Sequence, residues 1–143
     1  MIKIEQSIVI NRPVEDVFVY VTDNSKTAEW QSGLKESTVV SEGPLAVGSI
    51  IKDIRTLAGM EMDSTVEVTA FERNKKFGLK VQSGPVPFEL IQTFEAVEGG
   101  TKINFASQGE PGGFFKLAGP MLAKQMEKEF AANSEKLKEI LES

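Results

Sequence analysis

The chain has 143 residues, of which 41% are hydrophobic and 26% charged, with sixteen Lys or Arg against twenty-one Asp or Glu. This length and composition predict one globular domain over residues 1–143 and exclude a disordered acidic chain. The net charge is −5 and no basic cluster is interleaved with aromatic residues, so we expect no nucleic-acid binding.

Three features that the sequence lacks further limit the functions that we expect. No apolar run is long enough to span a bilayer, so we expect no membrane insertion. The first residues alternate like a strand and lack the apolar core of a secretion signal, which makes a cytoplasmic location the expectation. Cys and His are both missing, which removes thiolates, the commonest metal ligands and the usual acid–base group near neutral pH. Chemistry would need carboxylates, Lys, Tyr20, hydroxyls or a bound cofactor, and we expect neither a metal nor a cofactor.

The first thirty residues predict one strand followed by two short helices. The strand extends from Ile2 to Asn11, and Pro13 suits the first turn of a helix, where a backbone N–H is not needed. Apolar residues at 14, 17, 18 and 21 have helical spacing. Asp23 can cap a second short helix that ends near Trp30.

The segment from Leu34 to Gln108 predicts five or so antiparallel strands, because its connections are too short for parallel crossovers. The alternation is clearest over 60–68, where Met60, Met62 and Ser64 share one face. In 50–57 the inner face stays open, since Ile50 and Ile54 lie on one side and Ile51, Asp53, Arg55 and Leu57 on the other. The later inner faces are predicted to contain Phe77, Leu79, Val81, Phe88, Leu90, Gln92, Phe94, Ile103, Phe105 and Ser107.

A long amphipathic helix is predicted from Gly119-Pro120 to about Leu141. Its apolar stripe consists of Leu122, Met126, Phe130, Leu137 and Ile140. The glycine-rich loop before it matches no phosphate-binding pattern. For the apolar segment Phe114, Phe115 and Leu117 we favour ordinary packing over a lid or a docking patch.

These elements predict an α+β fold in which a curved antiparallel sheet of six to seven strands wraps around the long C-terminal helix. One helix, about 10 Å across, cannot cover so many strands unless the sheet curls around it, and curling tends to leave an internal space. Gly48, Gly59, Gly78 and Gly84 are candidate bend positions.

Three segments resemble a known superfamily. They are Asn11-Arg12-Pro13-Val14-Glu15-Asp16-Val17-Phe18, then Trp30 followed by Gly43-Pro44-Leu45-Ala46-Val47-Gly48-Ser49, and Thr93-Phe94-Glu95-Ala96-Val97-Glu98-Gly99-Gly100-Thr101-Lys102-Ile103. With the element order, they resemble the helix-grip fold of START-like (SRPBCC) proteins, in particular the polyketide cyclase/dehydrase and lipid transport branch. The resemblance covers essentially the whole chain. It implies the fold far more strongly than one activity, because members include binders, carriers, cyclases and dehydratases.

The candidate ligand contacts come from the predicted inner faces and from the mouth of the cavity. They are Trp30, Asp53, Arg55, Met60, Met62, Ser64, Phe77, Leu79, Phe88, Leu90, Gln92, Phe105, Leu122, Met126 and Phe130. For Trp30 we favour a plug between helix and sheet over a gate or stacking role. For Asp53 and Arg55 we favour an outward, solvated pair over an inward polar anchor. At Gln92 and Ser107, bonds within the protein and bonds to a ligand stay open as alternatives.

Three functions remain. The leading hypothesis is a carrier or sensor that binds a small lipophilic molecule in the cavity. The second, which rests on the resemblance, is a cyclase or dehydratase in which Arg55, Asp53 or Tyr20 assists proton transfer. The third is a protein-interaction module, and a homodimer stays open because sequence does not set the oligomeric state.

Overall fold

A computed structural model of the chain describes residues 2–57, 59–83, 88–109 and 119–143. The N-terminal elements are β1 (Ile2–Ile10), α1 (Val14–Thr22), the 3-10 turn η1 (Asn24–Lys26) and α2 (Thr27–Trp30). They are followed by β2 (Leu34–Val39), β3 (Ile50–Leu57), β4 (Met60–Glu72), β5 (Lys76–Ser83), β6 (Phe88–Val97), β7 (Gly100–Gly109) and the helix α4 (Gly119–Glu142). The predicted strand, short helices and long helix are confirmed, and Asp23 accepts a hydrogen bond from the Ser25 N–H as a cap.

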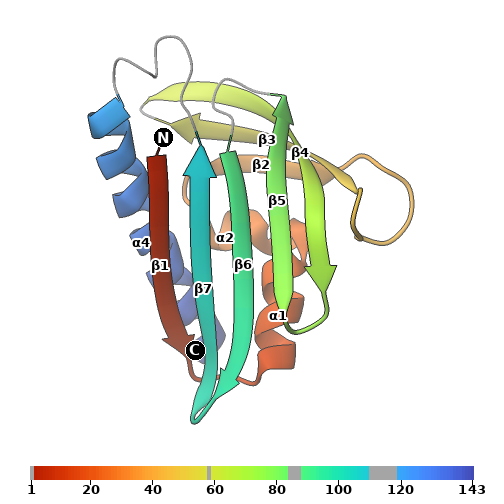
Figure 1. Ribbon diagram of the computed structural model, residues 1–143, viewed down its shortest axis with the longest axis vertical. Coiled ribbons are helices and arrows are strands. Elements are labelled where there is room, and N and C mark those ends of the chain that lie inside the picture. The colour runs from red at the N-terminus through yellow and green to blue at the C-terminus, as the bar shows by residue number, and fades with distance from the viewer. Residues whose placement is uncertain (1, 58, 84–87, 110–118) are drawn as a thin grey trace.

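The seven strands form one antiparallel sheet in the order β1-β7-β6-β5-β4-β3-β2 (Figure 1). Each strand from β2 to β6 pairs with the next strand along the chain, while β1 pairs with β7. The tight turns explain this order, because Asn74 and Gly99 adopt positive φ between neighbouring strands. At Gly100 a Cβ would overlap the backbone at Ile10, so this turn requires glycine where β1 passes close by.

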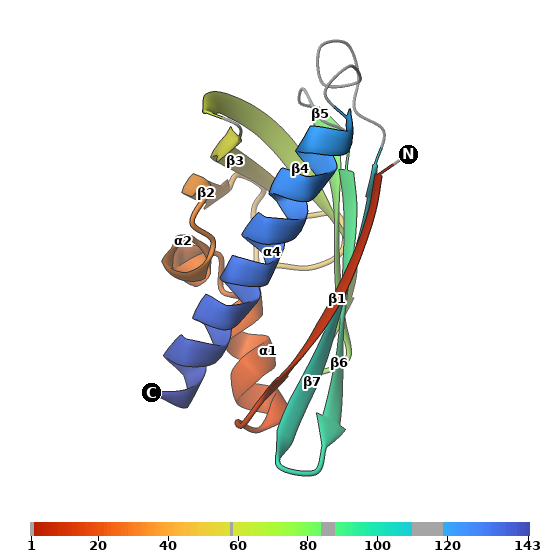
Figure 2. The same ribbon diagram turned by 90° about the vertical axis from the view of Figure 1, so that its left-hand side faces the viewer.

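The sheet bends around α4 (Figure 2). Its pairing shifts register between Thr65 and Val66 and again between Val68 and Ala70, and such bulges increase local twist. Gly78 pairs with Ala70 beside the second shift, in a position where a Cβ would press on Thr69 Oγ1. Gly48 and Gly59 lie instead in turns with positive φ, and Gly84 is outside the described residues.

The helix α4 lies on the concave side of the sheet along β1 (Figure 2). Its exposed face carries Lys124, Lys128, Glu135, Lys136 and Glu139, as the pattern predicts. Leu137 is fully buried, in one core with Ile10, Val17 and Ile103. At the same end Phe18 of α1 packs edge-on against Phe94, with ring centroids 5.0 Å apart. Within the described part of the chain, no helix combines the length and apolarity needed to span a membrane.

Candidate functional site

A cavity lies between the concave face of the sheet, α2 and α4. Its volume is about 190 Å³. An engineered apolar cavity of about 150 Å³ in another protein holds benzene, so this cavity has room for a larger guest. The bend that sequence reasoning predicts therefore leaves a hollow interior.

Most of the cavity wall is apolar, because the pleat turns alternate residues of the central strands inward. Cross-strand pairs join these residues, since Ile51 lies opposite Val66 and Leu79 lies opposite Leu90. The apolar wall consists of Val21, Trp30, Ile51, Met62, Val66, Phe77, Leu79, Val81, Phe88, Leu90, Phe105, Met126 and Phe130.

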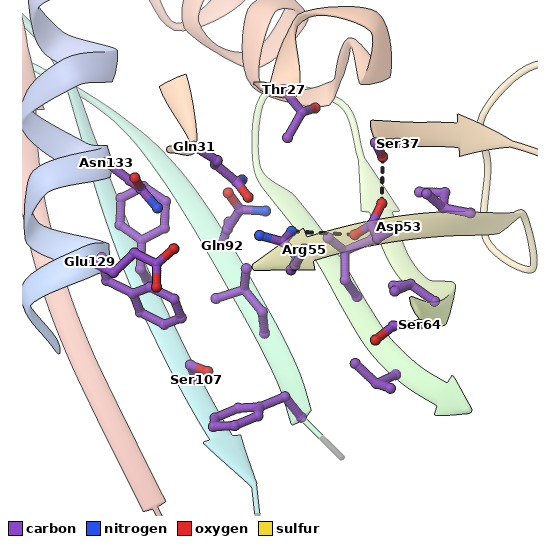
Figure 3. A pocket seen from close by; sticks show the side chains of 18 of the residues that line it. Thr27, Gln31, Ser37, Asp53, Arg55, Ser64, Gln92, Ser107, Glu129 and Asn133 are labelled. Carbon is purple, nitrogen blue, oxygen red and sulfur yellow. Dashed lines mark hydrogen bonds and ion pairs between the residues drawn. The ribbon is translucent and has the colours of Figure 1, made fainter. Parts of the chain in front are cut away.

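A polar cluster interrupts this wall on β3. Asp53 is buried, and its Oδ1 accepts a hydrogen bond from the Ser37 hydroxyl at 2.5 Å. Ser37 in turn accepts from the Asn24 amide at 2.7 Å, while Arg55 Nη2 donates to Asp53 Oδ2 at 3.3 Å (Figure 3). The favoured outward orientation of Asp53 and Arg55 is wrong. The pairing register of β3 with β4 explains why both side chains point inward. Asp53 pairs with Ser64 and Arg55 pairs with Met62, and both partners lie on the inner face of β4.

Glu129 of α4 faces the same cluster and was missed by sequence reasoning. Burial raises the pKa of its carboxyl, and the nearby Arg55 charge offsets part of that increase. Asn133 lies one helical turn further along, and its Oδ1 accepts from the Ser32 N–H at 3.1 Å. Glu129 and Asn133 fall on the same helix face as Met126 and Phe130, and this spacing is the signal that could have found them.

Gln92 and Ser107 lie deep in the wall, 2% and 4% exposed respectively. Gln92 stands opposite Phe77 on one neighbouring strand and opposite Phe105 on the other. Its amide lines the cavity and makes no hydrogen bond among the described residues. An amide that lines the cavity without a partner in its wall can pair with an occupant, so Gln92 is a polar group open to a ligand.

Trp30 ends α2, is 5% exposed and lines the cavity. Its Nε1 is buried and has no hydrogen-bond partner among the described residues. Trp30 is therefore buried, as the favoured role of a plug requires, and it also lies where an occupant of the cavity can contact it.

Two predicted contacts are not part of the wall as described. Met60 is 45% exposed and does not line the cavity, because it begins β4 at the tip of the β3–β4 hairpin, where it pairs with Leu57. The side chain of Leu122 lies outside the described residues, as do Phe114, Phe115 and Leu117. The other thirteen predicted contacts line the cavity, and their role in binding a ligand stays a prediction.

Tyr20 was a candidate for proton transfer but does not line the cavity. Its hydroxyl donates to Glu29 at 2.8 Å. Burial and this hydrogen bond raise the Tyr20 pKa to about 12.

Among the described residues, no three His, Cys, Asp or Glu side chains gather where they could hold a metal ion.

Comparison with known proteins gives the family. Residues 1–142 match the family model described as "Polyketide cyclase / dehydrase and lipid transport". Because the match covers almost the whole chain, the chain belongs to this family, as the resemblance implied. A comparison with curated protein sequences finds no match.

Solved structures show the same fold over nearly their full lengths. A START superfamily protein from Mycobacterium smegmatis aligns with a TM-score of 0.85 and 14% identity, covering 99% of this chain and 98% of that one. A conserved protein from Geobacillus kaustophilus aligns with a TM-score of 0.80 and 20% identity, covering 99% of this chain and 95% of that one. The protein TTHA0849 from Thermus thermophilus aligns with a TM-score of 0.84 and 15% identity, covering 97% of this chain and 96% of that one. At these identities the likeness shows the fold alone, and it confirms the predicted START-like architecture.

Proposed function

We propose that the chain binds a small lipophilic molecule in the cavity between the curved sheet and α4, as a carrier or sensor. One observation carries the proposal, namely an internal space of about 190 Å³ whose wall is mostly apolar by area and carries polar side chains from β3, β6, β7 and α4. Ligand sites in proteins have this composition, because apolar surface supplies affinity and a few polar groups fix orientation. The family description, which includes lipid transport, supports the same function.

A screen with a cavity-filling variant tests this function. Native mass spectrometry of the purified chain and thermal shifts with fatty acids, sterols, quinones and polyphenols are expected to reveal at least one ligand. Ser107→Phe places a ring in the cavity and is expected to abolish the shift. Ala106→Phe, on the exposed side of the same strand, is the matched control and is expected to retain it. Equal shifts in both variants would place any binding outside the cavity.

A second candidate is the cyclase or dehydratase activity, favoured by one observation. Glu129 offers the cavity a carboxyl whose pKa is raised, and a carboxyl that titrates closer to neutral pH suits proton transfer. The test is deuterium exchange at the enolisable positions of 2-tetralone, followed by NMR. Catalysed exchange that is lost in Glu129→Gln but kept in Glu127→Gln supports it. Identical exchange with and without protein counts against it.

The protein-interaction hypothesis stays a prediction. Exposed large apolar side chains among the described residues are Val9, Val19, Val40, Val47, Met60 and Met121. They are spread over several elements and loops rather than gathered on a single element, so they give this function little support.

A further inference from the structure

The charged groups of the cavity wall are unbalanced. Among the described residues that line it, Arg55 is the sole cation, while Asp53 and Glu129 are both carboxyl groups. Asp53 already accepts from the Arg55 guanidinium at 3.3 Å. Glu129 approaches from the opposite side, and no ion pair with Arg55 is formed among the described residues (Figure 3). The positive charge is therefore matched before any ligand enters.

The hydrogen-bonding groups of the wall are less well satisfied than its charges. Arg55 has five N–H donors, and its hydrogen bond to Asp53 uses one of them. Gln92 is 2% exposed, and its amide both donates and accepts, with no partner among the described residues. Phe77 and Phe105 flank Gln92 on the neighbouring strands and offer it no polar atom. The wall therefore presents neutral hydrogen-bonding capacity together with a cation that is already paired.

We propose that the cavity selects an uncharged lipophilic molecule whose polar end both accepts and donates hydrogen bonds, such as a phenol or hydroxyketone, and discriminates against carboxylates. This selectivity rests on the proposed function. Arg55 donates to the ligand oxygen, and the Gln92 amide pairs with the same polar end. A carboxylate would add a negative charge beside Asp53 and Glu129, and burying it without a free cation is costly.

Calorimetry with three ligands of one ring system tests the selectivity. The full chain is titrated with naphthalene, 2-naphthol and 2-naphthoate at mildly alkaline pH, where the naphthoate is ionised and the naphthol is not. We expect 2-naphthol to bind at least about tenfold more tightly than 2-naphthoate, and several-fold more tightly than naphthalene. Naphthoate binding equal to or tighter than naphthol binding overturns the selectivity and leaves cavity binding intact. If none of the three binds, the selectivity is overturned, and the proposed function fails with it when the screen of fatty acids, sterols, quinones and polyphenols also finds no ligand.

Charge-removing variants test which groups cause the discrimination. Asp53→Asn keeps the side-chain shape but frees Arg55, so naphthoate affinity is expected to rise about tenfold with little change for naphthol. Glu129→Gln removes the second carboxyl and is expected to act in the same direction. Glu127→Gln, exposed on the same helix, is the matched control. A naphthoate-to-naphthol ratio that stays at the wild-type value in both cavity variants overturns the proposal, and Glu129→Gln decides alone if Asp53→Asn fails to fold.

Discussion

The Ser37 hydroxyl donates to the buried Asp53 carboxylate, and hydrogen bonds to charged groups are among the stronger ones in proteins. We predict that Ser37→Ala lowers the free energy of unfolding by about 1–2 kcal/mol, because among the described residues Asp53 then keeps only its contact with Arg55. Urea denaturation measures the change. Ser64→Ala is the control, since Ser64 also lines the cavity but makes no hydrogen bond among the described residues, and an equal loss in both variants would contradict the prediction.

The Glu129 carboxyl predicts a specific pH dependence of stability. Burial raises its pKa in the folded state above the ordinary value of 4.5, and Arg55 opposes this only in part. The folded state therefore keeps its proton in a pH range where the unfolded state has lost it. The free energy of unfolding consequently falls as pH rises from 4.5 through the folded-state pKa of Glu129.

Glu129→Gln should remove this decline, because glutamine does not titrate. We expect its free energy of unfolding, measured by urea denaturation across that pH range, to exceed the wild-type value increasingly as pH rises. Glu127→Gln, an exposed neighbour, should follow the wild-type curve. Parallel curves for wild type and Glu129→Gln would show that burial does not perturb the Glu129 carboxyl.

Individual inward residues were predictable where strand alternation was clean. Phe77, Leu79 and Leu90 lie in the wall as their alternation predicts. Asp53 and Glu129 were harder to place, because charged residues on a strand or an amphipathic helix usually face water. Partners distant in sequence, Ser37 for Asp53 and Arg55 for Glu129, contribute to the polar surroundings of these carboxyl groups inside the fold.

At the scale of elements, α4 stabilises the fold through its buried stripe. Leu137 is 0% exposed and packs in the main core cluster. We predict that Leu137→Ala lowers the free energy of unfolding by about 2–5 kcal/mol, since it removes apolar contacts and leaves a cavity. Lys136→Ala, on the exposed side of α4, should change it by less than about 0.5 kcal/mol in the same chemical denaturation experiment. Comparable losses in the two variants would contradict the assigned helix face.

The β3–β4 hairpin shows what sequence reasoning missed at this scale. Alternation in 50–57 was ambiguous, yet the short turn after Leu57 pairs Leu57 with Met60 and so places Asp53 opposite Ser64. Since paired residues of an antiparallel ladder share a face, the inner face assigned to Ser64 also fixes that of Asp53. Met60 follows the same alternation but lies at the hairpin tip, where alternation alone does not predict burial.

At the scale of the molecule, the curved sheet was predictable from the number of strands that one helix must cover. The cavity volume was not, because it depends on how side chains from distant strands and α4 fill the space. Polar groups of the cavity wall that lack a hydrogen-bond partner lower the stability of the empty protein, but they are available to bind a ligand. Stability and binding therefore place opposite demands on these groups.

Gln92 gives this conflict a measurable form. We predict that Gln92→Leu raises the free energy of unfolding by about 1 kcal/mol, because an apolar side chain of similar size replaces an amide that lines the cavity and has no partner among the described residues. The same variant should lose the preference for 2-naphthol over naphthalene. Thermal or urea denaturation measures the first effect and calorimetry the second. A destabilised variant would mean that the Gln92 amide is satisfied within the protein.

The central claim is that the interior accepts a guest, and Trp30 allows this to be tested directly. Trp30 is the one tryptophan of the chain and lines the cavity, so a nitrogen-15 NMR spectrum has a single indole N–H signal at the site. On titration with 2-naphthol, we predict that this signal shifts and saturates at one equivalent of bound ligand, and that it stays unchanged in Ser107→Phe. An indole signal that does not move in the wild-type protein, even at saturating 2-naphthol, would contradict the claim.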